Sequence, residues 1–449
     1  MILLVVLFVF FASFLFLEQQ TAIKNVLLKG VLAFYIAISI LSLFFCLFLF
    51  AKISFLVFQA VFLIIPLGYI AISIRKDPTV YSLQAFKKVP SLLLMVILLA
   101  LLQFSYQFFN TVARWGDWDA WAIWSQHARF LTDADCFTSL FTNDISWTHP
   151  DYPLMLPSIL AMGFNSFGIN TAEVPVIFGY LIAISLVLLI LSSFLEKGFR
   201  LSGMSVFLLL TITELLFAFV NTQQADTFLA VFMLIPIVLI NHLPIQKINY
   251  HLILVGFFAA ICGWIKNEGL VFFALFAFCF CIGYFRKPIY LKYFAIGAVF
   301  PLFVLVLFKI VYAPAGDILG ENGLFAQKLS DFSRYEMVWA FAKDYLSENC
   351  KFLIYMMAAI LIVNYKYYFS FAFLVTAGLF ASYILVYIIT PHDLGWHLST
   401  SFYRLVHQVF PLLIYSVFFY VALNGAAGFW KVLYGKLISR FKGNSPIKI

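Results

Sequence analysis

The sequence predicts an all-α protein that crosses a lipid bilayer many times. Hydrophobic residues make up 64% of the 449-residue chain and charged residues only 11%, whereas an ordinary soluble protein is about 45–50% apolar and about 25% charged. A soluble fold cannot bury so much apolar surface, which excludes a soluble enzyme. No basic patch is interleaved with aromatic residues on a soluble module, so nucleic acid is not expected as a partner.

The apolar segments account for about 13 transmembrane helices, each of which needs roughly 20 mostly apolar residues. The candidates are 2–17, 30–50, 54–74, 90–110, 173–195, 203–220, 227–241, 250–265, 269–285, 290–312, 350–363, 367–389 and 403–424. The first of them has no basic start and no small-residue cleavage site, so we expect a retained helix rather than a signal peptide.

Lysine and arginine residues assign the connections to two sides of the membrane, because basic residues accumulate on the cytoplasmic side. The connections 75–88 and 196–200 and the tail 425–449 are basic and are predicted to be cytoplasmic. Further basic residues assigned to this side are Lys247, Arg286, Lys287, Lys292 and Lys366. Three apolar segments separate the first two connections, so one of them must fail to cross. The best candidate is the short segment 152–168, which is predicted to be re-entrant or interfacial on the outer side.

The predicted external side carries most of the tryptophan and histidine residues. It holds eight of the nine tryptophans and five of the seven histidines, together with the long connections 111–151 and 313–347. An aromatic belt by itself would populate both interfaces. The asymmetry therefore indicates a large external cleft built from several loops.

The connection 111–151 contains an aromatic and acidic stretch with three regularly spaced tryptophans. Trp118, Trp121 and Trp124 recur every third residue, which predicts that they share one face of a helix. The opposite, polar face is predicted to comprise Asp119, Gln126, His127 and Arg129. This pattern is typical of an amphipathic helix in the outer membrane interface.

Two acidic residues of this stretch are candidate catalytic carboxylates. Asp119 is favoured because it lies on the predicted polar face, which points into the aqueous cleft. Asp117 is the second candidate, although an aspartate at this position would equally suit the N-cap of the helix. The alternative to both is a solvated interfacial helix without chemistry.

A second external group follows in the stretch Trp147-Thr-His-Pro-Asp-Tyr-Pro153. The prolines stop a regular helix here. His149 and Asp151 would face the same cleft as Asp119, and one histidine with two aspartates would suit a divalent cation such as Mg, Mn or Zn. The alternative is an ordinary proline-rich turn, so the sequence itself requires no cofactor.

Charged residues also occur at the predicted external ends of later helices. Charges near membrane depth are costly and are a functional hypothesis by default. Arg404 suits a phosphate group, and His397, which precedes it by two helical turns, is expected on the same helix face. Lys266 is a further candidate anion ligand, although it would also neutralise Glu268. For Arg404 the alternative is a side chain that extends to the interface.

The order of these features resembles the GT-C superfamily of polytopic membrane glycosyltransferases, which includes the protein O-mannosyltransferases and the aminoarabinose transferases that modify lipid A. The resemblance covers 90–424 and leaves 1–89 as transmembrane helices outside the family core. The family's acidic residue on the first external loop matches Asp119, with Asp117 beside it, and its proline-rich segment matches 149–153. The family's external turns match the stretches Gln224-Ala-Asp226 and Ile265-Lys-Asn-Glu268.

The chain departs from the family pattern in two places. Many members have adjacent acidic residues in the first loop, whereas this chain has the stretch Asp117-Trp-Asp119. The family's proline before the second external aspartate is also absent, because Ala225 precedes Asp226. The subfamily is therefore left open.

The resemblance implies a glycosyltransferase that uses a polyprenyl-phosphate-linked sugar donor at the external, periplasmic face of a bacterial inner membrane. Asp119 or Asp117 would act as general base, and the anomeric carbon would be inverted. Lys266, His397 and Arg404 would bind the donor phosphate. The expected substrate-binding residues are Trp118, Trp121, Trp124, Asp151, Asp226, Glu268 and Trp396. The sequence leaves open whether the acceptor is a glycan, a lipid or a protein.

Two other functions compete with this interpretation. One is a multi-pass transporter or a flippase for lipid-linked saccharides, but such proteins often contain inverted repeats and polar groups near the membrane midplane. Here the polar groups lie at external helix ends, and no internal repeat is found. The other is an O-antigen-type ligase or polymerase, which the acidic and aromatic helix disfavours.

Overall fold

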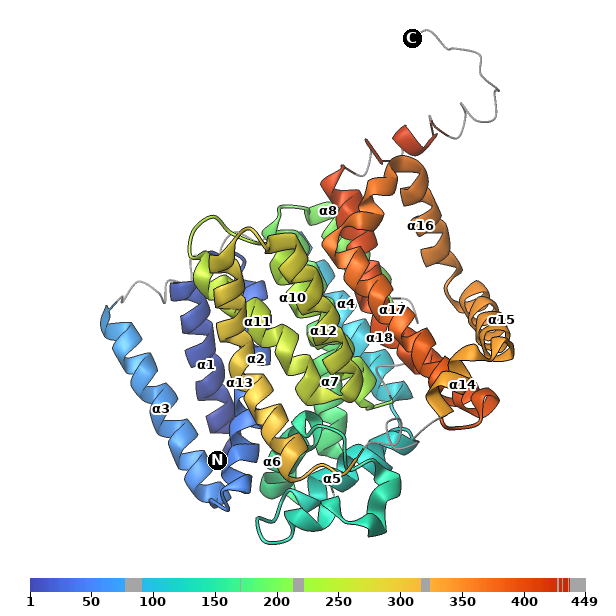
Figure 1. Cartoon of the computed structure of the whole chain (residues 1–449). Helices are drawn as coiled ribbons and strands as arrows, with labels where there is room; N and C mark the ends of the chain where they lie inside the picture. The colour runs from blue at the N-terminus through green and yellow to red at the C-terminus, as the bar shows by residue number, and fades with distance from the viewer. Residues whose placement is uncertain are drawn as a thin grey trace, which may run out of the picture.

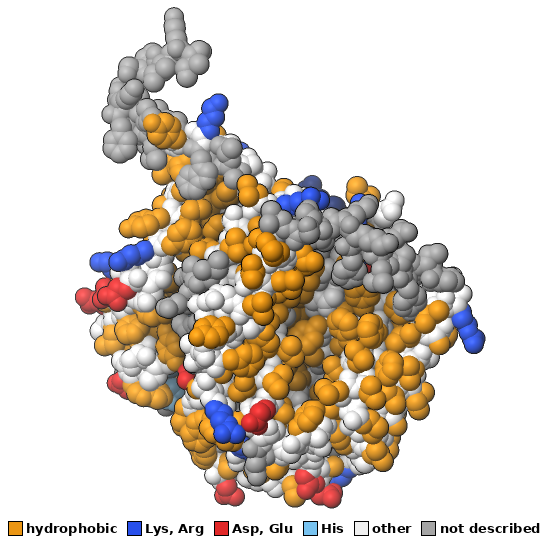
Figure 2. All heavy atoms as spheres, turned by 180° about the vertical axis from the view of Figure 1, so that it is seen from behind, with side chains coloured by type: hydrophobic (Ala, Val, Ile, Leu, Met, Phe, Trp, Pro, Cys, Tyr) orange, Lys and Arg blue, Asp and Glu red, His pale blue; other side chains and the backbone are white. Residues whose placement is uncertain are grey.

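The computed structural model describes residues 1–76, 91–169, 171–212, 222–315, 324–425, 428–429, 431–434 and 436. Within these residues all regular secondary structure is helical, and eleven helices are long and apolar enough to cross a membrane. The chain is therefore an all-α, multi-pass membrane protein. Figure 1 shows the long helices packed side by side, with α5 and α6 at one end of the bundle and the C-terminus at the other. Figure 2 shows that hydrophobic side chains cover most of one face.

The candidate membrane-spanning helices follow one another along the chain with three shorter apolar helices between them. The long helices are α1 (Ile2–Gln20), α2 (Val26–Phe50), α3 (Phe55–Lys76), α4 (Ser91–Thr111), α7 (Glu173–Glu196), α11 (Ile248–Ile265), α12 (Asn267–Tyr284), α13 (Pro288–Val311), α16 (Lys351–Asn364) continued by η7 (Tyr365–Phe369), α17 (Phe371–Ile389) and α18 (Leu394–Leu423). The shorter helices are α6 (Met155–Phe167), α8 (Arg200–Ile212) and α10 (Ala225–Asn241).

Two predicted spans, 203–220 and 227–241, correspond, within the described residues, to helices below the length of the eleven candidate membrane spans. The first matches α8, which leads into residues 213–221, outside the described part of the chain. The second matches α10, whose 17 residues extend over about 25 Å at 1.5 Å per residue. Nearly all side chains of α10 are buried, so this helix is surrounded by protein rather than by lipid.

The segment predicted to be re-entrant or interfacial forms the short helix α6. Its 13 residues are about 20 Å long, less than the roughly 30 Å of a hydrocarbon core. Most of its side chains are buried, and the hydroxyl groups of Ser158 and Ser42 are 2.7 Å apart. A helix of this length that is covered by protein agrees with a segment that does not cross.

The N-terminal helices are integrated into the bundle rather than attached to its outside. The Tyr35 hydroxyl of α2 is hydrogen-bonded to Ser185 of α7, and the indole N–H of Trp264 donates to Ser42 Oγ at 3.0 Å. Most of α2 is buried. Residues 1–89 were expected outside the core of the family resemblance, yet α2 forms part of the same packed interior as the later helices.

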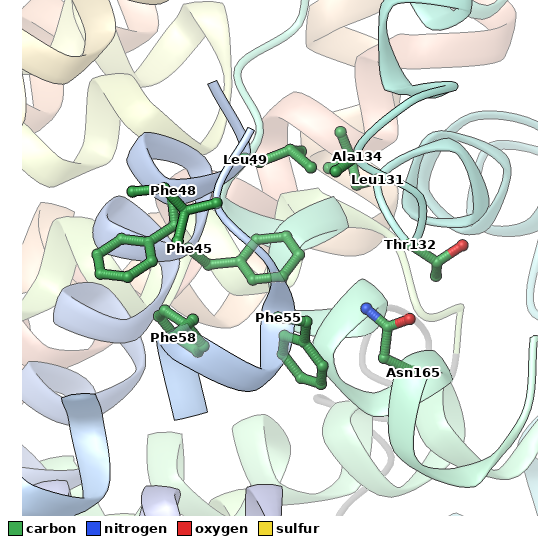
Figure 3. A pocket seen from close by; sticks show the side chains of 10 residues that line it. Phe45, Phe48, Leu49, Phe55, Phe58, Leu131, Thr132, Ala134 and Asn165 are labelled. Carbon is green, nitrogen blue, oxygen red and sulfur yellow. The ribbon is translucent and has the colours of Figure 1, made fainter. Parts of the chain in front are cut away.

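The helices α2 and α3 also face the segment that follows α5 (Ser125–Phe130). A shallow pocket separates them, and Figure 3 shows its aromatic wall opposite Thr132 and Asn165. The wall and the facing residues are Phe45, Phe48, Leu49, Ile53, Phe55, Phe58, Leu131 and Ala134. The first helices thus support the end of the bundle where the predicted external loop folds.

Contacts at the opposite end agree with the predicted cytoplasmic side. The backbone N–H groups of Lys24 and Asn25 donate to the Glu196 carboxylate at 2.6–3.1 Å. Lys247 Nζ donates to the backbone carbonyl of Gln19 at 2.5 Å. The connection 196–200 and Lys247 were both assigned to the cytoplasm, and the structure brings them to the same loop between α1 and α2. Of the predicted cytoplasmic tail 425–449, the structure describes residues 425, 428–429, 431–434 and 436.

The predicted external connection 313–347 contains two helices, α14 (Leu324–Ser330) and α15 (Phe332–Asn349); its residues 316–323 lie outside the described part of the chain. Arg334 of α15 donates through Nε to the Ile388 carbonyl at 2.6 Å and through Nη2 to the carbonyls of Tyr387 and Thr390. These carbonyls belong to the end of α17, where the last backbone acceptors of a helix have no intrahelical donor. Arg334 therefore fastens α15 to the outer end of α17.

Reciprocal glycines allow α11 and α13 to approach closely. A Cβ atom on Gly256 would lie 1.9 Å from the Phe294 carbonyl oxygen, and one on Gly297 would lie 2.0 Å from the Ile253 carbonyl oxygen. Small residues let membrane helices pack with their backbones in contact. The glycines on both helices are thus required for this packing.

Replacing Gly256 with alanine is expected to destabilise the protein by about 1–3 kcal/mol, the usual cost of overpacking, because a backbone carbonyl cannot move out of the way as a side chain can. Thermal unfolding in detergent measures the effect. Gly283→Ala is the matched control, because a Cβ atom there meets nothing within 4 Å. Equal unfolding temperatures for the two variants would contradict the close packing.

Candidate functional site

Acidic and basic side chains from distant parts of the sequence meet at the predicted external end of the bundle. Arg404 Nη2 lies 2.5 Å from Asp119 Oδ2 and 3.3 Å from Asp226 Oδ2. Lys266 Nζ lies 3.0 Å from Asp226 Oδ1 and 2.9 Å from Glu268 Oε1. These five residues, which we call the ion-pair network, were all identified as candidates from the sequence.

Four of the five members of the network lie at an end or a break of a helix, and Arg404 lies inside one. Asp226 occupies the first turn of α10, where the helix dipole favours a negative charge. Lys266 has an extended backbone between α11 and α12, and Glu268 follows it in the first turn of α12. Arg404 lies within α18, and Asp119 immediately precedes the helical part of the first external loop.

The centre of the network is closed to solvent. Asp226 is 3% exposed and Lys266 is 2% exposed. Buried charges are stable only when they are paired and hydrogen-bonded. Asp226 meets this condition, because both of its carboxylate oxygens contact a cation.

Two uncharged residues that sequence reasoning missed complete the surroundings of Asp226. Gln408 Nε2 donates to Asp226 Oδ1 at 2.5 Å, and the Tyr383 hydroxyl donates to Gln408 Oε1 at 2.5 Å. The spacing could have identified Gln408 as a site residue, because Gln408 follows Arg404 by four residues and so lies on the same face of α18. A polar side chain on such a face in an otherwise apolar helix is a functional hypothesis in its own right.

Asp117 has a different setting from Asp119. Asp117 is exposed, whereas Asp119 is buried. The Asp117 backbone N–H donates to the Thr222 carbonyl at 3.1 Å, and Gln224 Nε2 donates to its carboxylate at 3.4 Å. Partial desolvation raises the pKa of the Asp117 carboxyl above its usual value, and Arg404 opposes this effect. Asp117 is therefore the more accessible of the two carboxylates, and its pKa is raised.

The prediction that three tryptophans share one helix face is wrong for Trp124. Trp118 and Trp121 are 51% and 45% exposed and their rings are 6.3 Å apart, but Trp124 is fully buried. The reason is a turn of π-helix over Ala120–Trp124, in which the Ser125 N–H bonds to the Ala120 carbonyl. Five-residue closure changes the angular spacing that a regular α-helix would impose.

The exposed tryptophans are joined by a third that the sequence did not assign to the site. Trp147 is 52% exposed and its ring lies 5.9 Å from that of Trp118. Trp118, Trp121 and Trp147 therefore form one aromatic patch beside Asp117 and Asp119.

The predicted polar face of the same helix is also partly wrong. His127 is fully buried, and its Nε2 lies 3.1 Å from the Thr148 hydroxyl. Burial lowers the pKa of His127 to about 3, so the ring is neutral at ordinary pH. His127 therefore ties α5 to the loop before His149 and does not face the aqueous cleft.

Tyr152 organises the proline-rich stretch. Its ring is stacked between Trp124 and His149, at centroid distances of 5.6 Å and 5.1 Å and interplanar angles of 15° and 14°. Lys266 Nζ lies 6.0 Å from the centroid of the Tyr152 ring. Burial raises the pKa of the Tyr152 hydroxyl well above its usual range, so Tyr152 supports the network as a neutral aromatic surface.

The predicted metal ligands His149 and Asp151 are not gathered into a metal site. In the described part of the chain, no group of three histidine, cysteine or acidic side chains is placed to hold a metal ion. The His149 ring is stacked on Tyr152, and Asp151 Oδ2 accepts a hydrogen bond from Asn267 Nδ2 at 2.9 Å. His149 and Asp151 thus each have protein partners, and a metal site at these residues stays a prediction.

Lys309, another residue missed from the sequence, lies beside Asp151. Its Nζ donates to the Asp151 backbone carbonyl at 2.6 Å and to Asn267 Oδ1 at 2.9 Å. Lys309 belongs to the last turn of α13 and is half-buried. Its position on the predicted external side was the signal that could have identified it.

His397 and Trp396 lie in the first turn of α18, away from the ion pairs. His397 Nδ1 is 2.8 Å from the Thr390 hydroxyl and its ring lies 4.9 Å from that of Tyr387. Trp396 is 57% exposed. His397 precedes Arg404 by seven residues, about 10 Å along the helix axis. Among the described residues, no hydrogen bond or ion pair joins His397 to Lys266 or Arg404, and the phosphate-binding role of these three residues stays a prediction.

Comparison of the chain with known protein families, with curated proteins and with solved structures finds no match. The geometry of the external end is thus the basis for assigning a function.

Proposed function

We propose that this protein is a GT-C-like membrane glycosyltransferase. It transfers a sugar from a polyprenyl-phosphate-linked donor to an acceptor hydroxyl at the external face of a bacterial inner membrane. The observation that carries the proposal is the contact of Arg404 with both Asp119 and Asp226. This contact joins the acidic stretch of the first external loop to the external ends of two later helices.

The reaction needs a base, an anion site and a place for the sugar. The acceptor oxygen attacks the anomeric carbon and forms the new glycosidic bond. The bond from that carbon to the phosphate oxygen breaks, and its electron pair leaves with the polyprenyl phosphate. The acceptor proton passes to a carboxylate, and the configuration at the anomeric carbon inverts. A positioned base typically contributes about 10²–10⁴-fold to the rate.

Asp117 is the better placed general base, and Asp119 acts through Arg404. Asp117 is exposed and its only side-chain hydrogen bond in the described part of the chain is the 3.4 Å contact with Gln224. Asp119 is buried and has a 2.5 Å ion pair with Arg404, so its carboxylate is already occupied by a protein cation. The sequence favoured Asp119 as the general base, whereas this proposal assigns that role to Asp117.

The aromatic patch of Trp118, Trp121 and Trp147 supports a substrate with apolar faces. Tryptophan offers a large, rigid, flat surface together with an N–H donor. The patch adjoins the two carboxylates through Trp118, which lies between Asp117 and Asp119 in sequence. A sugar with hydroxyl groups at its edges and C–H groups on its faces fits this combination.

Native mass spectrometry of the purified protein mixed with polyprenyl phosphate tests the proposal. We expect a mass increment of one lipid molecule. With a glycosylated donor and an acceptor fraction, we expect the sugar to be lost from the lipid. Retention of bulk phospholipid alone would contradict the proposal. Movement of an intact lipid-linked sugar across proteoliposomes, without transfer, would identify a flippase instead.

A further inference from the structure

Three cations lie in or beside the ion-pair network, and they differ in the groups that neutralise them. Lys266 contacts the carboxylates of Asp226 and Glu268, and Arg404 contacts those of Asp119 and Asp226. Lys309 instead contacts two neutral oxygens, the Asp151 carbonyl and the Asn267 side-chain amide. Among the described residues, no carboxylate oxygen lies within 4.0 Å of Lys309 Nζ.

The balance of charge makes the network a poor site for an anion. It contains three carboxylates against two cations, so its formal charge is negative. A phosphate placed against Lys266 or Arg404 would lie next to carboxylates that already occupy the same cations. At such short range and in partly buried surroundings, like charges repel strongly. An anionic ligand therefore requires a cation outside the network.

Lys309 satisfies that requirement and lies next to the network. Asn267, its amide partner, stands between Lys266 and Glu268 in sequence. Asp151, its carbonyl partner, precedes Tyr152, whose ring centroid is 6.0 Å from Lys266 Nζ. Lys309, in the last turn of α13, is thus connected to the network through Asn267.

The hydrogen-bond capacity of Lys309 is also incompletely used. A lysine ammonium group has three N–H donors, and the two contacts to Asp151 and Asn267 account for two of them. The Asp151 carboxylate attracts Lys309 electrostatically, but its Oδ2 accepts from Asn267 Nδ2, and in the described part of the chain it forms no ion pair with Lys309. One N–H donor, and a charge that no such ion pair neutralises, remain for a ligand.

We propose that Lys309, oriented by Asn267, binds the phosphate group of the substrate, in the role that the sequence assigned to Lys266, His397 and Arg404. The proposal rests on the proposed function, because it takes the phosphate to be that of a polyprenyl-linked donor. The competing role is structural: a cation in the last turn of a helix interacts favourably with the helix dipole. Binding measurements separate the two roles.

The experiment compares polyprenyl phosphate binding by wild type, Lys309→Gln and Lys309→Arg, using titration followed by native mass spectrometry. Lys309→Gln keeps a hydrogen-bond donor and removes the charge, so we expect affinity to fall about tenfold or more. Lys309→Arg keeps the charge and should retain most of the affinity. Lys343→Gln is the control, because Lys343 is exposed on α15. Thermal unfolding of each variant shows whether the fold is intact.

The outcomes distinguish the inference from the proposed function. If wild type binds polyprenyl phosphate and folded Lys309→Gln binds equally well, the role of Lys309 is overturned and the proposed function stands. If wild type binds no polyprenyl phosphate, the proposed function itself fails. A parallel titration with inorganic phosphate identifies the source of the anion. If inorganic phosphate binds in a Lys309-dependent manner, the site recognises the phosphate group without the polyprenyl chain. If only polyprenyl phosphate binds, recognition requires the polyprenyl chain.

Discussion

Replacing Asp117 with asparagine is expected to lower the rate of sugar transfer by about 10²–10⁴-fold, the usual contribution of a positioned general base. Asparagine has nearly the same shape but cannot accept the acceptor's proton. Donor binding should be largely unchanged, because among the described residues Asp117 forms no hydrogen bond or ion pair with Lys309 or with the ion-pair network. The measurement is the single-turnover rate at saturating donor, together with the donor affinity from native mass spectrometry.

The pH dependence provides an independent check on Asp117. A base works only in its ionised form, so the rate should fall as the pH decreases through its pKa. Because partial desolvation raises the pKa of Asp117, the acid limb should lie above the value of about 3.9 for an ordinary aspartate. Asp144→Asn is the control, since Asp144 is exposed on the same loop. Near-normal turnover by Asp117→Asn, with loss of turnover by Asp119→Asn, would assign the base role to Asp119.

Replacing Lys266 with methionine is expected to reduce the free energy of unfolding by about 3–5 kcal/mol, the range found when one partner of a buried ion pair is removed. Lys266 is 2% exposed and contacts two carboxylates. Methionine preserves much of the side-chain volume but leaves Asp226 and Glu268 without this cation. Unfolding in detergent, by heat or by denaturant, measures the loss.

Two further variants test whether pairing is the cause. Lys343→Met removes an exposed lysine and should leave stability nearly unchanged. The double variant Lys266→Met with Asp226→Asn should lose less than the sum of the single variants, because residues in contact are coupled. Strict additivity would show that Lys266 and Asp226 stabilise the protein independently and would contradict the ion-pair network.

The fold class and the sidedness of the chain follow from local properties of the sequence. Runs of apolar residues favour transfer into a bilayer wherever they occur, and basic residues accumulate on the cytoplasmic side. The eleven long helices within the described residues agree with the all-α, multi-pass prediction. The connection 196–200 and Lys247, which were assigned to the same side, meet at the end of α1 and the loop that follows it.

The membership of the candidate site was also largely predictable. Charges are so costly near membrane depth that Asp226, Lys266 and Arg404 stood out in apolar surroundings. Composition alone could not assign partners to them. The contacts of Arg404 with Asp119 and Asp226 join residues 285 and 178 positions apart, and such pairs exist only once α10 and α18 have packed together.

The wrong predictions for Trp124 and His127 arise because tertiary contacts decided the burial of these side chains. A regular helix was assumed for Trp118, Trp121 and Trp124, but one π-helical turn buries Trp124 against Tyr152. His127 was placed in water because of its polarity, yet a hydrogen bond to Thr148 allows it to be buried.

The sequence by itself determined that the protein lies in a membrane, which charged residues are candidates for a site, and which carboxylates are candidates for chemistry. These properties depend on the free energy of transferring each side chain from water into the bilayer, which is a local property of the residue. Only the tertiary structure decided which cations form ion pairs with carboxylates, and that Lys309 forms none among the described residues. The reason is that electrostatic energy depends on distances between side chains. Those distances are set by helix packing between segments far apart in the chain.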